Sequence, residues 1–147
     1  MRELDASYSV YDAKGKILGR FASAMARELI AGKSIAVINA ERAIIVGNRS
    51  VIVKKYFTRL NLQEKENPEY SPYWSRRPDM LVKRAIRGML PKKAGGRSAY
   101  RKLMVFIGTP GQLAKVKPIE IRAKDANAIY MPHVTMEELS HILGYSR

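Results

Sequence analysis

The sequence lacks cysteine and has few histidines and acidic residues. Its 147 residues include no cysteine and two histidines. Without cysteine the chain can form neither disulfides nor a thiolate zinc site, which fits an intracellular setting. No apolar run approaches the roughly 18 residues of a membrane-spanning helix, and residues 1–5 show no apolar core of a secretory signal. We therefore expect a soluble intracellular protein.

The scarcity of acids leaves a large excess of positive charge. Asp and Glu number 13 against 27 Lys and Arg, and the net charge is +14. Apolar residues still make up 46% of the chain, which is too many for a disordered basic tail. A chain of this length fits one domain with its own core, and we expect a single domain over residues 1–147. Residues 112–147 are expected to form a C-terminal arm with a short helix.

The positive charge is concentrated in residues 76–102. This segment holds ten Lys and Arg and one acid, Asp79, which gives a net charge of +9. Like charges at this density repel one another and destabilise the compact state. A polyanionic partner removes that penalty, and nucleic acid is the commonest polyanion that soluble proteins meet. An anionic membrane surface and a merely solvated basic face are the alternatives.

The first forty residues predict a βαβ unit. Residues 7–11 alternate as a strand does, and residues 12–15 have the composition of a turn. An amphipathic helix follows from about Ile17 and is stopped by Gly32. Residues 34–39 then form an apolar strand. Strand, helix and strand in this order favour a parallel pair and hence an α/β fold.

The next elements are less regular. Residues 43–46 are a strand that either pairs with the preceding strand as a hairpin or lies elsewhere in the sheet. Residues 49–60 place their apolar side chains on one helical side, and residues 62–78 form a long polar loop.

A second amphipathic helix begins at Pro78, the favoured first position of a helix, and ends at Pro91. One side of it is apolar and the other is cationic. We expect a Gly/Lys/Arg loop over 92–102, a core strand over 103–107 and a turn over 108–111.

After residue 111 the sequence shows little hydrophobic periodicity until the final helix. Residues 112–132 form a poorly patterned arm. Thr135 and Glu138 have the spacing of a capping box, which predicts a short final helix that Gly144 stops.

Catalysis has little support in the sequence. His133 and His141 stand without cysteine or a Ser-His-acid spacing, so we expect no catalytic site, no metal and no cofactor. Residues 15–20 join a strand to a helix, but they match neither G-x-x-x-x-G-K-[ST] nor G-x-G-x-x-G. An ordinary turn is the favoured interpretation, and a small nucleotide-binding enzyme is the competing one.

The basic segment predicts a surface that binds phosphates. Gly88, Gly95 and Gly96 would let a polyanion backbone approach closely. Tyr70, Tyr73 and Tyr100 would stack on unpaired bases, and Trp74 would either stack likewise or pack the loop onto the domain. The predicted RNA-binding residues are Lys54, Lys55, Arg59, Arg76, Arg77, Lys83, Arg84, Arg87, Lys92, Lys93, Arg97, Tyr100, Arg101 and Lys102.

Several ordered motifs resemble one known family. The most specific is the block Ile86–Pro91, followed by Gly96-Arg97 and the apolar strand that ends at Gly108. Residues 11–23, 37–41 and 47–48 carry further matches. Over residues 8–110 the chain resembles the universal protein number thirteen of the large ribosomal subunit. It lacks the insertion of bacterial members, and residues 130–144 resemble the archaeal and eukaryotic branch.

The resemblance implies a fold, a partner and a location. The fold would be a three-layer α/β/α domain around a small, mainly parallel sheet of about four strands. The partners would be large-subunit ribosomal RNA and neighbouring ribosomal proteins, with no membrane and no small-molecule substrate. The protein would be a cytoplasmic, non-enzymatic component of the ribosome that supports subunit assembly and translation. The RNA contacts that carry over from the family are Arg84, Arg87, Lys92, Lys93, Arg97 and Arg101.

Overall fold

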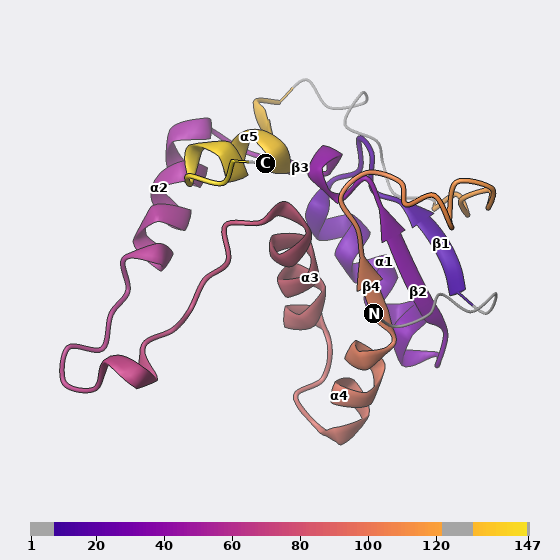
Figure 1. The fold of residues 1–147 in the computed structure, drawn as a ribbon, viewed down its shortest axis with the longest axis horizontal. Coiled ribbons are helices and arrows are strands. Elements are labelled where there is room, and N and C mark those ends of the chain that lie inside the picture. The colour runs from indigo at the N-terminus through magenta and orange to yellow at the C-terminus, as the bar shows by residue number, and fades with distance from the viewer. Residues whose placement is uncertain (1–7, 122–130, 147) are drawn as a thin grey trace.

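The elements follow the order expected from the sequence, with two additions besides two short 3-10 helices. The computed structural model describes residues 8–121 and 131–146, and Figure 1 shows its elements in chain order. They are β1 (Tyr8–Asp12), α1 (Leu18–Ile30), β2 (Ser34–Ile38), the 3-10 helix η1 (Ala40–Arg42), β3 (Ile44–Val46), α2 (Arg49–Leu60), the 3-10 helix η2 (Pro68–Tyr70), α3 (Pro78–Met89), α4 (Ala94–Arg101), β4 (Leu103–Val105), β5 (His133–Thr135) and α5 (Met136–Ile142). The additions are α4 and β5. Ser7, expected in the first strand, lies outside the described residues.

A parallel sheet of three strands, in the order β1-β2-β4, forms the centre of the fold. β1 pairs with β2 from Tyr8 opposite Ser34, and β2 pairs with β4 from Ile35 opposite Leu103. Parallel neighbours need a crossover, which α1 supplies between β1 and β2. The predicted βαβ unit and the α/β class are therefore confirmed. β4 ends at Val105, two residues earlier than predicted.

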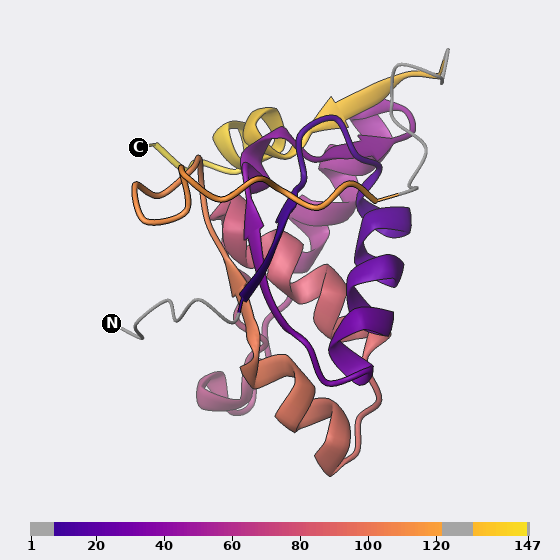
Figure 2. The same ribbon diagram turned by 90° about the vertical axis from the view of Figure 1, so that its right-hand side faces the viewer.

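The helices pack against one face of this sheet. Ile35 and Val37 of β2 form one fully buried cluster with Phe21 and Met25 of α1 and Ile86 of α3. α1 and α3 contact each other and lie on the same side of the strands (Figure 2). The apolar stripes expected on both helices are the surfaces that they bury.

The opposite face is covered by the chain that follows β4. Val10, Ala36 and Ile38 form a second buried cluster there with Leu113. The covering segment makes two successive turns, and the Ile119 N–H donates to the Val10 carbonyl at 2.8 Å. The third layer implied by the resemblance is thus, in the described residues up to 121, an irregular segment. Tyr8 and Phe106 also pack against this cluster.

β3 lies in a second, two-stranded sheet. It pairs antiparallel with β5, with Ile45 opposite Val134. The expectation of a hairpin with β2 or of a place in the main sheet is therefore wrong. Both edges of β2 are occupied by β1 and β4, and η1 turns the chain away from them. The predicted capping box is confirmed, because Thr135 and Glu138 each accept the other's backbone N–H through their side chains.

α2 and α3 occur where the sequence predicts them. At α2 the Asn48 side chain accepts the Ser50 N–H at 3.1 Å, and this N-cap helps to offset the weak helix preference of the β-branched residues that follow. The long loop between the two helices is interrupted only by η2 among the described residues. Pro78 opens α3 as predicted.

Residues 94–101, expected to be part of a loop, form helix α4 instead. The two glycines at its start cost about 1 kcal/mol each relative to alanine. Gly96 is required by a close approach, because a Cβ atom there would lie 1.8 Å from the Pro91 carbonyl oxygen. Ala99 is buried in the main core and helps to fix α4 there. The glycine at 96 therefore serves the contact of α4 with Pro91.

Candidate nucleic-acid interface

α3 holds its cationic side chains on the side opposite the core. Val82 and Ile86 are fully buried, whereas Lys83 and Arg84 are half-buried and Arg87 is exposed. The side chains three and four residues apart on a helix share a face. Packing of the apolar stripe therefore fixes the direction in which the cations point.

α4 brings an aromatic ring to this cationic side. The Lys83 ammonium and the Arg87 guanidinium lie 5.3 Å and 5.6 Å from the centre of the Tyr100 ring. Both distances are within the range of cation–π attraction. Lys83, Tyr100 and Arg101 also line a groove of about 410 Å³ beside β4, together with Leu103 and Met104. Three of the predicted residues thus meet at one groove.

Trp74 joins the long loop to α2 and α3. The Arg84 guanidinium carbon lies 3.8 Å from the centre of its ring, and that of Arg59 lies 4.7 Å away. Arg84 also donates a hydrogen bond to the Tyr73 carbonyl at 2.8 Å. Of the two roles expected for Trp74, this arrangement favours packing of the loop, because the protein's own cations already lie against the ring.

Two of the predicted residues form hydrogen bonds with other groups of the protein. Arg77 donates two hydrogen bonds to the Asp79 carboxylate, at 2.8 and 3.2 Å, and these bonds raise the pKa of Arg77 above its ordinary value. Lys102 donates to the Gly32 carbonyl at 2.9 Å. Both cations therefore have a structural role as well as a charge.

The other predicted cations lie at the surface in two places. Lys92, Lys93 and Arg97 are exposed where α3 passes into α4, whereas Lys54 and Lys55 are exposed on α2, apart from that surface (Figure 1). Arg76 is exposed just before α3. The residues that the structure brings together on α3 and α4 are called the α3–α4 surface: Lys83, Arg84, Arg87, Lys92, Lys93, Arg97, Tyr100 and Arg101.

Two contributors to this region are absent from the predicted residues. Tyr56 lies 5.3 Å from the Arg59 guanidinium, and burial raises the pKa of its hydroxyl, with the Arg59 charge acting in the opposite sense. The i, i+3 spacing of the two residues on a helix is a signal that predicts this contact. Met104 lines the groove, and no feature of the sequence indicates it.

Backbone N–H groups at and just before the turn of residues 15–20 form hydrogen bonds within the protein. The N–H groups of Gly15 and Lys16 donate to the carbonyls of Arg42 and Ala13, at 3.0 and 3.1 Å. The Lys14 N–H donates to the Asp12 side chain at 2.9 Å. A phosphate loop needs such amides directed at the ligand. The interpretation as an ordinary turn is therefore favoured over a nucleotide site.

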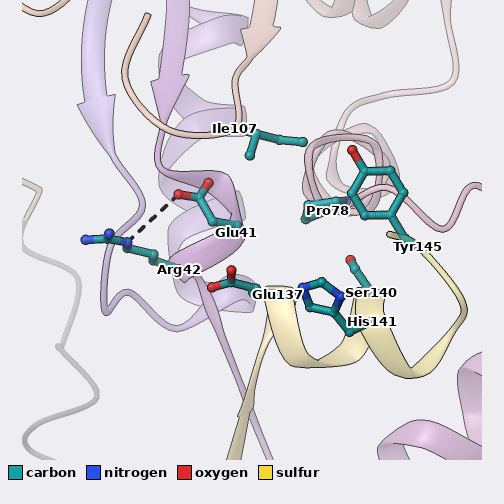
Figure 3. A pocket seen from close by; sticks show the side chains of 8 residues that line it. All are labelled: Glu41, Arg42, Pro78, Ile107, Glu137, Ser140, His141 and Tyr145. Carbon is teal, nitrogen blue, oxygen red and sulfur yellow. Dashed lines mark ion pairs between the residues drawn. The ribbon is translucent and has the colours of Figure 1, made fainter. Parts of the chain in front are cut away.

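The two histidines lie on different elements. His133 is on β5, and His141 is on α5 at a cavity of about 140 Å³ that Glu41 and Tyr145 also line (Figure 3). The neighbouring Ser140 hydroxyl is buried and has no hydrogen-bond partner among the described residues, so His141 does not activate it as a base would. Within residues 8–121 and 131–146, no three acidic or histidine side chains are grouped to hold a metal ion.

The membrane alternative is not favoured by α3, because the apolar stripe of this helix is buried. In the described part of the chain, no helix is long and apolar enough to span a bilayer. A helix that lies on a membrane needs a free apolar stripe, but Leu81, Val82 and Ile86 of α3 are buried in the core.

A family model and the related proteins all place this chain in the same family. The family model described as ribosomal protein L13 matches residues 6–112. A protein of Methanopyrus kandleri named large ribosomal subunit protein uL13 is 37% identical, over 94% of this chain and 87% of its own length. Proteins of the same name from Archaeoglobus fulgidus and Methanosarcina barkeri are 37% and 39% identical, over 99% and 92% of this chain and 93% and 97% of their own lengths. All three come from archaea, in line with the branch that residues 130–144 resemble. The chain therefore belongs to the ribosomal protein L13 family, a family of large-subunit ribosomal proteins and not of enzymes.

Proposed function

We propose that this chain is a structural constituent of the large ribosomal subunit in the cytoplasm and binds large-subunit ribosomal RNA through the α3–α4 surface. One observation carries the proposal. Among the described residues, Lys83, Arg84 and Arg87 rest against aromatic rings, and neither they nor Lys92, Lys93 and Arg97 pair with a carboxylate. None of these charges is therefore neutralised, and the three on α3 are also held in place by rings, which suits a polyanion-binding surface.

The chemistry of such a surface follows from its residue types. Arginine forks match two phosphate oxygens at once, and lysines act as point charges. Each phosphate that is neutralised releases condensed counterions, so binding weakens as salt rises. A-form RNA is recognised mainly by its shape and its backbone. The groove between Lys83 and Arg101, with its Tyr100 wall, would hold one RNA backbone segment.

The fold supplies the rigidity that this role needs. α3 is fixed by its buried face, and α4 is fixed by the contact of Gly96 with Pro91. Cations on a rigid element lose less conformational freedom on binding than cations on a free loop. The complete chain would act as one RNA-binding domain that supports subunit assembly and translation, next to other large-subunit proteins.

Binding to RNA fragments across a salt titration tests this proposal. The full-length chain would be titrated with fragments of large-subunit ribosomal RNA and with an unrelated structured RNA of the same length. We expect a steep salt dependence together with a clear preference for one ribosomal fragment. Equal affinity for every RNA would contradict a dedicated ribosomal RNA site and would leave only a general basic binder.

A further inference from the structure

The tip of the long loop differs in charge from the rest of the protein. Residues 61–71, called the loop tip, contain Glu64, Glu66 and Glu69 against Lys65, a net charge of −2 in a chain of +14. Residues 61–70 are all exposed. Helix α2, which precedes the loop tip, and helix α3, which follows the loop, are both basic. The negative segment is therefore bounded by positive ones.

Hydrogen bonds form within the loop tip, and ring contacts form at its base. The Glu64 N–H donates to the Ser71 hydroxyl at 2.9 Å. The Tyr70 N–H donates to the Asn67 carbonyl at 3.0 Å, which forms the turn of η2. At the base, Trp74 lies against Arg59 and Arg84. These contacts shape the surface that the loop presents.

The same loop displays tyrosine side chains that are largely exposed to solvent. Tyr70 is 80% exposed and Tyr73 is 85% exposed, with Leu62 at 50%. Tyr73 is the stronger indication of a binding surface. Arg84 donates a hydrogen bond to its backbone carbonyl, while its side chain remains exposed to solvent. Tyrosine brings a large contact area at a low entropic cost, and it is enriched at the centres of protein interfaces.

We propose that the loop tip, with Tyr70 and Tyr73, docks an Arg- and Lys-rich segment of another protein. Aromatic rings bind cations elsewhere in this chain, at Tyr56, Trp74 and Tyr100. Tyr70 and Tyr73 offer the same ring faces with no cation of their own among the described residues. The three glutamates add attraction for a basic segment and repel a phosphate backbone. This surface adjoins the α3–α4 surface at Arg84, but the proposal does not depend on the RNA site.

Peptide binding to the full-length chain tests the proposal. The probes are labelled octa-arginine and octa-lysine peptides and a labelled twelve-residue uridylate, followed by fluorescence anisotropy at fixed salt. Trp74 is the only tryptophan, so a change in its emission reports binding near the base of the loop, and the variants below decide whether the tip is involved. We expect octa-arginine to bind at least threefold more tightly than octa-lysine, because guanidinium groups stack on rings better than ammonium groups do.

Matched variants locate the binding. Tyr70→Ser with Tyr73→Ser should weaken octa-arginine binding about tenfold, while the double Phe variant should retain it because the ring face is kept. Glu66→Lys with Glu69→Lys should weaken it similarly. Glu120→Lys with Glu137→Lys is the control, since these exposed residues lie outside the loop and the variant has the same net charge. Circular dichroism checks that all variants are folded.

Three results would overturn the proposal. Equal weakening by the loop and control charge variants would mean general electrostatics. Retained octa-arginine binding in the double Ser variant would exclude the rings. Loss of uridylate binding in that variant, with no peptide binding to the wild type, would make RNA the occupant. The ribosomal RNA proposal is judged separately, since the loop variants are expected to leave the affinity for the preferred fragment within twofold.

Discussion

The α3–α4 surface and the βαβ unit at the start of the chain hold positive charge in two different ways. In the βαβ unit, Lys33 pairs with the Glu28 carboxylate, and in η1, just after the unit, Arg42 lies 3.9 Å from Glu41. On α3 the partners of Lys83 and Arg84 are aromatic rings instead. A carboxylate cancels the charge that it orients, whereas a ring orients a cation and leaves its charge in place. Lys33 and Arg42 thus lie beside a carboxylate, whereas Lys83 and Arg84 keep their charge available.

The largest expected effect comes from reversing charge on the α3–α4 surface. Arg87→Glu with Lys93→Glu should weaken binding to the preferred ribosomal RNA fragment roughly a hundredfold near 0.1 M salt, and should reduce the salt slope by about two. Both side chains are exposed, so the fold should be intact. The measurement is a binding titration at several salt concentrations, with thermal unfolding as a check.

The βαβ unit provides the matched control for this variant. Arg20→Glu with Arg27→Glu changes the net charge by the same amount on the exposed side of α1. This control should lower RNA affinity only slightly, since it changes the general field of the protein and not the contact surface. Equal losses in the two variants would remove the distinction between the regions.

The second-largest expected effect is on stability and concerns the position of α4. This helix carries Arg97, Tyr100 and Arg101 of the α3–α4 surface. Gly96→Ala should destabilise the protein by about 1–3 kcal/mol, because the added methyl group overlaps the Pro91 carbonyl and α4 must shift. Gly95→Ala places its methyl group in open space and should stabilise the helix by up to about 1 kcal/mol. Denaturant unfolding measures both. Equal stability of the two variants would show that α4 does not depend on this contact.

A comparison of α4 with α1 and α3 shows which helices can be predicted from the sequence. α1 and α3 are predictable because their apolar residues recur at helical spacing over three turns. α4 has only eight residues, begins with Ala-Gly-Gly and follows a proline and two lysines, so its local preferences indicate a loop. Its helical form depends on burial of Ala99 and on the fit of Gly96, which are tertiary contacts that the local pattern does not contain.

The candidate site divides in the same way. The cationic side of α3 follows from residue spacing alone. The pairing of Arg59 with Trp74 joins residues on two elements and depends on the path of the loop between them, and β3 finds β5 about ninety residues later in the chain. Local periodicity therefore predicts which side chains share a face, but not which faces meet.

A smaller effect is expected from the ring that orients the cations. Tyr100→Leu removes the cation–π contacts of Lys83 and Arg87, worth about 0.5–1 kcal/mol each at an exposed site, and should weaken RNA binding about threefold to fivefold. Tyr100→Phe keeps the ring face and should bind as the wild type does. The same titration measures both. A loss in the Phe variant as large as that in the Leu variant would assign the effect to the hydroxyl group.

The smallest expected effect concerns the Glu28–Lys33 pair of the βαβ unit. It should change the stability of the protein at high pH and leave the RNA affinity unchanged. Glu28, through a hydrogen bond and its charge, raises the pKa of Lys33 above its ordinary 10.5, so the folded state binds this proton more tightly than the unfolded state does. The resulting stabilisation is present below pH 10.5 and is lost as the pH rises through the folded pKa. Burial, and then Glu28, also raise the pKa of the Tyr11 hydroxyl, which adds a loss of the same sign.

Glu28→Gln should therefore unfold slightly more easily than the wild type at pH 8, and the two unfolding curves should converge above about pH 10.5. Thermal unfolding from pH 8 to 11 measures the convergence. A difference that does not change with pH would attribute the effect to packing of the residue and not to the ion pair. A fall in RNA affinity at neutral pH would place this carboxylate, and with it the βαβ unit, in the RNA site. Unchanged affinity is what separates a cation that serves the fold from one that serves a partner.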